Sequence, residues 1–118
     1  MPEYRRLYHP GGTYFFTVNL LDRSQTFLTD RNEDLMACFE SVNAEHPFEM
    51  LAYAVMPEHL HCIWILPEGD SDFSTRWKKI KGRFTRCIPR SADTQKGRRA
   101  GERGIWQRRF WEHLIRDD

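Results

Sequence analysis

The chain of 118 residues is 40% hydrophobic and 14% aromatic, which indicates one folded domain with a substantial core and excludes a wholly disordered chain. Its formal net charge of +1 conceals a strong asymmetry. Residues 1–75 hold four Lys or Arg and twelve Asp or Glu, whereas residues 76–109 hold thirteen basic residues and two acidic ones. A basic segment of this kind is typical of proteins that contact a polyanion, although a solvated basic loop has the same composition.

The first predicted elements are a strand and a helix. Residues 13–20 are rich in β-formers and follow a Pro-Gly-Gly turn, so a strand is expected there. Asp30 is the predicted N-cap of a helix that runs to about Glu45 and is stopped by Pro47. The apolar stripe of this helix comprises Leu35, Cys38, Phe39 and Val42.

A hairpin and a second helix follow. Residues 48–55 predict a second strand and residues 59–66 a third, and the short connection between them predicts an antiparallel hairpin. After a turn at residues 67–70, Asp72 or Ser74 is expected to cap a helix over residues 73–87. Its apolar face comprises Phe73, Trp77, Ile80 and Phe84, and the neighbouring stripe is basic, with Arg76, Lys79, Arg83 and Arg86.

The last part of the chain completes a recognisable order of elements. Residues 90–104 are rich in Gly, Ser and Arg and predict a loop, and residues 105–115 predict a final strand. The order is strand, helix, strand, strand, helix, strand. It predicts a ferredoxin-like α+β fold, in which an antiparallel sheet carries two helices on one face. We expect residues 1–118 to form a single domain of this type.

The cysteines and the N-terminus indicate the compartment. Cys38, Cys62 and Cys87 are scattered and form no Cys-x-x-Cys pair, so the pattern favours neither a disulfide framework nor a cysteine zinc site. The first residues carry no apolar signal segment, and no apolar run is long enough to span a membrane. We therefore expect a cytoplasmic protein with reduced thiols.

Two histidines at the start of the third predicted strand are the strongest candidates for chemistry. His59 and His61 are two residues apart, so their side chains project from the same face of the strand. Two imidazoles held side by side on a rigid strand can place a divalent cation against a phosphate. The same pattern also fits ordinary half-buried histidines on a strand.

Several segments in a fixed order extend this pattern over the chain. They are residues 4–6 (YRR), 11–20 (GGTYFFTVNL), 55–64 (VMPEHLHCIW), 66–70 (LPEGD), 73–77 (FSTRW) and 105–113 (IWQRRFWEH). With these segments the chain resembles the REP-associated tyrosine transposases, which are relatives of the single-tyrosine insertion-sequence transposases in the HUH endonuclease superfamily. The resemblance implies a ferredoxin-like fold and a DNA transposition or recombination function.

The resemblance also implies a metal, a substrate and a nucleophile. His59 and His61 occupy the catalytic, metal-binding histidine positions of the family, which imply a divalent Mg or Mn ion. The implied substrate is single-stranded DNA folded into imperfect palindromic hairpins. The implied nucleophile is a tyrosine on a helix after the last strand, which also carries a third metal ligand. It leaves a 5′-phosphotyrosine and a free 3′-hydroxyl, so the strand can be rejoined.

The tyrosines of this chain depart from that pattern. They are Tyr4, Tyr8, Tyr14 and Tyr53, none of which is at the family's position. Because the sequence reaches Asp118 where the tyrosine helix would begin, we expect a domain truncated before that helix. Two histidines alone predict weak metal binding completed by water, and an uncovered apolar sheet face predicts self-association, with a homodimer as one form.

The candidate DNA contacts are basic and aromatic. The basic ones are Arg5, Arg6, Arg76, Lys79, Arg83, Arg86 and Arg108, and the aromatic ones, which could stack on bases or belong to the core, are Trp106, Phe110 and Trp111. A hairpin-binding or single-strand-binding module without chemistry stays an alternative to the DNA-cleaving enzyme. A two-histidine phosphoesterase is disfavoured, because the chain offers one His-x-His motif and no second motif of that kind. The sequence does not decide the role of His113.

Overall fold

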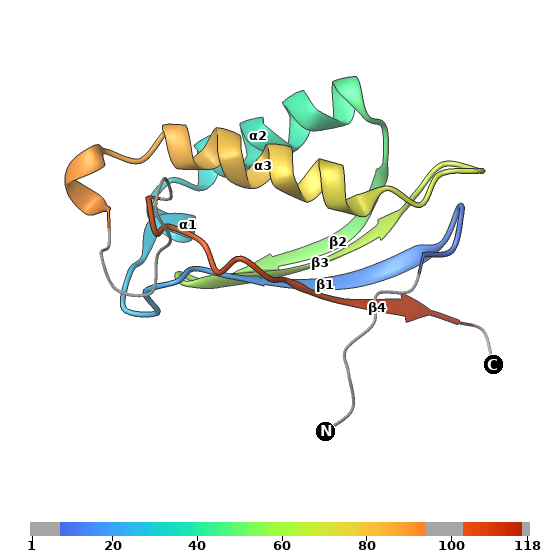
Figure 1. The fold of residues 1–118 in the computed structure, drawn as a ribbon, viewed down its shortest axis with the longest axis horizontal. Helices are drawn as coiled ribbons and strands as arrows, with labels where there is room; N and C mark the ends of the chain where they lie inside the picture. Colours follow the sequence, from blue (N-terminus) through green and yellow to red (C-terminus); the bar gives the residue numbers. More distant parts are fainter. Residues whose placement is uncertain (1–7, 94–102, 117–118) are drawn as a thin grey trace.

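The computed structural model describes residues 8–93 and 103–116. Its centre is a four-stranded antiparallel sheet in the order β2-β3-β1-β4. Two long helices lie side by side over one face of the sheet (Figure 1). The elements are β1 (Thr13–Asn19), α1 (Phe27–Asp30), α2 (Asn32–Glu45), β2 (Glu49–Val55), β3 (His59–Ile65), α3 (Phe73–Arg86), the 3₁₀ helix η1 (Arg90–Ala92) and β4 (Trp111–Ile115). The predicted α+β fold is confirmed, with α1 and η1 as additional short helices.

Alternation along the two central strands separates the faces of the sheet. Tyr14, Phe16 and Val18 of β1 are fully buried toward the helices, and the residues between them are half-buried or lie at the strand end. β3 alternates in the same way, because Leu60 and Trp64 are fully buried. β1 and β3 pair along their whole length, so their buried residues form one continuous apolar floor under the helices.

The helices cover this floor through the predicted apolar stripes. In α3 the residues Phe73, Trp77, Ile80 and Phe84 are all fully buried. The Trp77 ring stacks on the Trp64 ring at a centroid distance of 4.5 Å, which ties helix to sheet. The Asp72 carboxylate accepts a hydrogen bond from the Thr75 amide (3.0 Å), so the predicted N-cap of this helix is confirmed.

Two boundaries differ from the sequence prediction. Asp30 is not the cap of α2 but the last residue of α1, and its carboxylate accepts a hydrogen bond from the Thr26 hydroxyl. The short helix α1 is held in place because Leu28 is fully buried and its amide donates to the Pro57 carbonyl (3.2 Å). Tertiary burial therefore starts the helical region earlier and divides it.

The final predicted strand is also shorter than expected. Only Trp111–Ile115 form β4, while residue 106 makes an isolated antiparallel bridge with Leu20. Between them Phe110 turns into the core, where it is 7% exposed and packs against Phe16 and Trp77. The ladder breaks because this ring enters the helix layer. Among the described helices, none has the length and apolar character needed to cross a membrane.

Candidate metal centre

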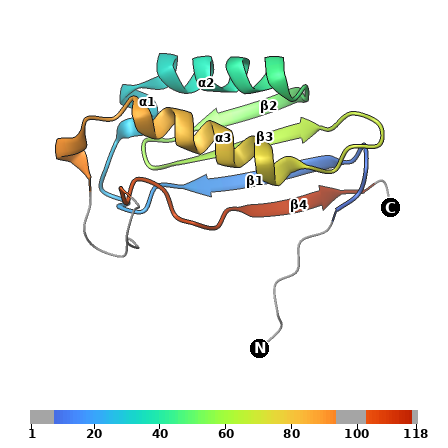
Figure 2. The same cartoon turned by 45° about the horizontal axis from the view of Figure 1, so that its top comes forward.

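In the described residues no helix lies on the second face of the sheet, and both histidines of the motif lie on this face. Figure 2 shows α2 and α3 on one side of the sheet only. His59 pairs with Asn19 and His61 with Thr17 in the β1–β3 register, and both imidazoles are on the strand positions that point away from the core. Their ring centroids are 5.0 Å apart with planes at 75°. We call this surface the open face.

Each histidine is held through the same ring nitrogen. His59 Nδ1 lies 2.8 Å from Oε1 of Glu58, and His61 Nδ1 lies 2.9 Å from the Thr17 hydroxyl. An ionised carboxylate only accepts, so His59 carries its proton on Nδ1 and donates it to Glu58. In the neutral ring this leaves the lone pair on Nε2. The hydroxyl of Thr17 can hold His61 in the same tautomer.

Glu58 links the pair to a basic side chain. Its carboxylate lies 3.6 Å from the Arg23 guanidinium and is mostly shielded from solvent. The hydrogen bond from His59 is the largest cause of the lowered pKa of Glu58, and the Arg23 charge adds to it. A carboxylate that accepts from the far nitrogen of a histidine orients the ring and raises its basicity as a ligand. The local geometry is therefore that of a supported ligand pair.

The donor set fits a divalent transition metal with an incomplete coordination shell. Imidazole nitrogen suits Mn²⁺ better than Mg²⁺, which prefers oxygen. In residues 8–93 and 103–116 no group of three or more His, Cys, Asp or Glu side chains could hold an ion. Two Nε2 atoms would therefore be the protein's donors here, and oxygen from water or a phosphate would have to fill the other positions.

Aromatic rings surround the histidine pair on the open face. The Phe15 ring stacks on His61 at a centroid distance of 5.4 Å and 21°. Trp111 pairs with Thr17 from the other side of β1, so it lies in the same cross-strand row as His61, and it is 52% exposed. His113 pairs with Phe15 one row further along and is also exposed. The open face thus presents flat rings beside two ligand nitrogens.

The predicted DNA contacts are not gathered around the histidines. Lys79 and Arg83 reach from α3 to α2 and form ion pairs with Glu45 at 3.1 and 2.5 Å, on the helix layer. The hydrogen bonds from both are the first causes of the lowered pKa of Glu45. Arg86 is exposed at the end of the same helix, and Arg108 is exposed at the end of the segment 103–108. Arg5 and Arg6 lie outside the described residues.

Arg76 corrects the sequence interpretation of the basic stripe. It is 2% exposed instead of facing solvent. Its guanidinium donates to both Asp70 carboxylate oxygens at 3.1 and 2.8 Å, and to the carbonyls of His46, Pro47 and Asp72. The residue therefore joins α3 to the loops before β2 and after β3. Helical spacing alone did not show this, because the partners come from distant segments.

The described tyrosines are directed away from the open face. Tyr14 is fully buried, and its hydroxyl donates to the His9 carbonyl at 3.0 Å. The Tyr8 ring stacks on Phe73 at 5.2 Å. Tyr53 pairs with Cys62, a position on the helix-covered side of the sheet, and Tyr4 lies outside the described residues. None of the tyrosines in the described segments stands beside the histidine pair.

Sequence reasoning missed the residues that support the histidines. Thr17 and Glu58 were both within the segments of the motif, but neither was given a role. Strand alternation identifies Thr17 as an open-face position once the β1–β3 register is known. The register depends on tertiary pairing, so local sequence held no direct signal for it. The adjacent acid Glu58 was the one visible clue.

The family model described as "Transposase IS200 like" matches residues 12–116, which is nearly the whole chain. A solved structure from Deinococcus radiodurans, described as a transposase, has a TM-score of 0.63 at 16% identity and covers 99% of this chain and 88% of its own. That likeness concerns the fold alone. The class is a transposase domain of the IS200 type.

Relatives with higher sequence identity identify the family more specifically. The chain is 49% identical over 117 residues to the REP-associated tyrosine transposase of Escherichia coli K12, and 42% identical to a Haemophilus influenzae protein of the same kind. It covers 64% and 68% of their lengths. A REP-associated tyrosine transposase solved with a REP hairpin shares 48% identity at a TM-score of 0.83, covering 100% of this chain and 64% of its own. The chain belongs to the REP-associated tyrosine transposases of the IS200-like family.

Proposed function

We propose that this chain is the hairpin-binding, metal-holding part of a transposase that acts on single-stranded DNA. The observation that carries the proposal is the support of both histidines through Nδ1, which presents both Nε2 atoms on the open face. A histidine pair with a purely structural role does not need an oriented Nδ1 contact on both rings that leaves both Nε2 atoms available. The solved relative with a REP hairpin supports DNA as the partner.

The chain's own residues would act in the following way. His59 and His61 would hold Mn²⁺ or Mg²⁺ through Nε2, and the ion would supply Lewis-acid polarisation of a scissile phosphate. Glu58 and Thr17 would keep both rings oriented, so that no reorganisation is needed when DNA arrives. Trp111 and Phe15 would offer ring faces for unpaired bases next to the phosphate.

In the full-length protein, cleavage would use a tyrosine outside these 118 residues. Its hydroxyl oxygen would bond to the phosphorus, the bond to the 3′ oxygen would break, and that oxygen would leave as a hydroxyl. The resulting 5′-phosphotyrosine keeps the ester energy, so the reverse attack can rejoin strands without a nucleotide cofactor. The positions of the described tyrosines support a nucleophile outside these residues, because these tyrosines lie away from the open face.

The second candidate is a DNA-binding module without chemistry. It is favoured by the two-ligand site and by the aromatic open face, which serve binding without a nucleophile. The apolar strand positions of this face include Ile63, Ile65 and Ile115, of which Ile115 is 40% exposed. We propose that this surface also permits association of two copies, which light scattering over a range of concentrations would measure.

One experiment tests binding and chemistry together. A labelled imperfect hairpin is incubated with the chain and Mn²⁺, then examined for a gel shift and for a covalent protein–DNA adduct. We expect a shift that is weakened by His61→Ala, and no adduct with this chain alone. Absence of hairpin binding in the wild type contradicts the proposed function, and an adduct contradicts the external nucleophile.

A further inference from the structure

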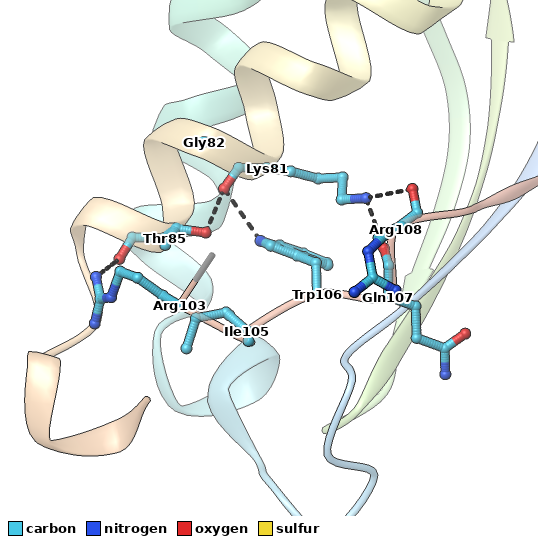
Figure 3. Close-up of a pocket in the computed structure, with 9 residues that line it drawn as sticks. Lys81, Gly82, Thr85, Arg103, Ile105, Trp106, Gln107 and Arg108 are labelled. Atoms are coloured by element: carbon cyan, nitrogen blue, oxygen red, sulfur yellow. Dashed lines mark hydrogen bonds between the residues drawn. The ribbon is translucent and has the colours of Figure 1, made fainter. Parts of the chain in front are cut away.

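A cavity of about 200 Å³ opens on the side of the molecule between α3 and the segment before β4. Figure 3 shows Lys81, Gly82 and Thr85 on the helix, facing Arg103, Ile105, Trp106, Gln107 and Arg108 on the segment. Its volume is below the roughly 300–1,000 Å³ of pockets that enclose drug-sized ligands. The space therefore suits one planar group or one phosphate.

The lining has the chemistry of a site for an anionic, flat ligand. Lys81, Arg103 and Arg108 bring positive charge, and no residue that lines the cavity is acidic in the part of the chain that the structure describes. Asp93 offsets part of the charge of Arg103, to which it is bonded at 2.6 Å. Trp106 supplies an indole ring, half-buried and held by a hydrogen bond from Nε1 to the Lys81 carbonyl (3.1 Å).

The walls of this cavity are built firmly. Lys81 Nζ donates to the carbonyls of Gln107 and Arg108 at 2.8 and 3.3 Å, and Arg103 donates to the carbonyls of Thr85 and Ile88 at 2.6 and 2.7 Å. These bonds attach the segment to α3 at both ends of the cavity (Figure 3). The space between them is therefore kept open by the fold.

The helix wall of the cavity contains a glycine. Gly82 lies in the interior of α3, where glycine weakens a helix relative to alanine. A Cβ at this position would meet no atom within 4 Å, so packing inside the protein does not require glycine. Its effect is to leave the helix wall of the cavity without a side chain. A group outside the chain can then approach the helix backbone closely.

The position of the cavity relates it to the open face. The Gln107 amide donates to the Asn19 carbonyl, and Asn19 pairs with His59 across the next strand gap. Two strand spacings separate the segment from His59, which is about 10 Å. A nucleic-acid strand that lies at the histidine pair can therefore pass round this edge of the sheet and reach the cavity.

We infer that the cavity between α3 and residues 103–108 binds one unpaired nucleotide of the DNA strand, with the base against Trp106 and Gly82 and the phosphate beside Arg108. This inference deepens the proposed function and depends on DNA being the partner. It separates an unpaired-strand contact at the sheet edge from the hairpin and metal contacts on the open face. Stacking and phosphate contact make such a site tolerant of base identity.

The test uses a variant that adds a side chain at the helix wall of the cavity without removing a contact. Gly82→Leu places a side chain in the open space, and leucine favours helix, so the melting temperature should stay level or rise. Ala37→Leu places the same side chain at an exposed position of α2 and is the matched control. Binding of a labelled single-stranded oligonucleotide without self-complementarity is followed by fluorescence anisotropy.

We expect Gly82→Leu to weaken oligonucleotide binding by roughly fivefold or more, the low end of what stacking one base contributes, while Ala37→Leu binds like the wild type. Equal binding by Gly82→Leu and the wild type would overturn the inference, and so would a wild type that binds no oligonucleotide. A labelled hairpin without unpaired ends is titrated in parallel. If this hairpin does not bind the wild type, the result counts against the proposed function. The comparison of oligonucleotide binding between Gly82→Leu and the wild type can still be interpreted.

Charge at the cavity gives a second, independent measurement. Arg108 lines the cavity, whereas its exposed neighbour Arg109 does not. Arg108→Gln should lower the slope of log affinity against log salt for the oligonucleotide by about 0.7, the value for one phosphate contact on a single strand. Arg109→Gln should leave the slope unchanged. Equal slopes for both variants contradict a phosphate contact at Arg108.

Discussion

Polar side chains on the two sides of the sheet direct their hydrogen-bonding atoms differently. On the helix-covered side, Arg76 is buried and directs its hydrogen bonds into the protein. On the open face, His59 and His61 use one ring nitrogen for support and direct the other outward. The two sides differ because successive side chains of a strand point in opposite directions: β3 places Trp64 on the helix-covered side and His61 on the open face. Stability and recognition can therefore be changed separately.

The largest effect should come from the covered side. Arg76→Ala removes the hydrogen bonds to Asp70 and to the carbonyls of His46 and Pro47, and it leaves the carboxylate without its counter-charge and the carbonyls without a donor. We expect the free energy of unfolding to fall by about 3–5 kcal/mol, as when one partner of a buried ion pair is removed. Urea unfolding measures this loss.

Lys78→Ala is the matched control for that variant, because Lys78 is exposed on the same helix. It should change the stability by less than about 0.5 kcal/mol. If Arg76→Ala were no more destabilising than Lys78→Ala, the structural role of Arg76 would be wrong. If the folded fraction of Arg76→Ala lost its Mn²⁺ affinity, the independence of the two faces would be wrong.

The next effect concerns the open face and should spare stability. His61→Ala removes one of two ligand nitrogens, so we expect Mn²⁺ affinity to fall by more than about 100-fold, beyond the range for supporting residues. The melting temperature should change little, because the imidazole is only half-buried. Isothermal titration with Mn²⁺ and thermal unfolding give the two readings.

His113→Ala serves as the control, since His113 is exposed on the same face one row away and pairs with Phe15. It should retain wild-type Mn²⁺ binding. A loss equal to that of His61→Ala would make His113 a third ligand, and the two-histidine site would have to be redrawn. Unchanged binding in His61→Ala would remove the metal centre altogether.

A smaller effect should follow from the support of His61. Thr17→Val keeps a β-branched side chain on β1 but removes the hydroxyl that lies 2.9 Å from His61 Nδ1. We expect Mn²⁺ affinity to fall by about 10–100-fold, as for other residues that orient ligands. In the metal-free protein, ¹⁵N NMR should show a lower fraction of His61 protonated at Nδ1. Thr17→Ser, which keeps the hydroxyl, should restore both readings.

The sequence predicted the framework of both faces but not their finer contacts. Strand alternation and helical spacing identified Trp64, Trp77 and the His-x-His pair, because these patterns are local. The burial of Arg76 and the Thr17–His61 contact come from segments 29 to 44 positions apart in sequence. Such contacts depend on register and docking, for which a single sequence carries little signal. The interruption of strand pairing before β4 also depends on tertiary packing, because Phe110 is buried there against the helices.

The smallest expected effect is a pH dependence of stability that comes from Glu112 in β4. Glu112 pairs with Phe16, so it is on the helix-covered side, and burial raises its pKa to about 6 from 4.5. The folded state therefore holds this proton more tightly than the unfolded state. Its contribution to stability is complete below about pH 4.5 and is lost as the pH rises through about 6.

Glu112→Gln removes this titration from the covered side of β4. At about pH 8 the variant should be more stable than the wild type by on the order of 1 kcal/mol, with little difference at about pH 4.5. Urea unfolding at the two pH values checks it, with Glu49→Gln at an exposed position of β2 as control. The same gain at both pH values would assign the effect to packing, because a neutral amide and a protonated carboxyl differ little in charge. A gain only at the higher pH would show that the helix-covered face tolerates a polar group there chiefly in its neutral form.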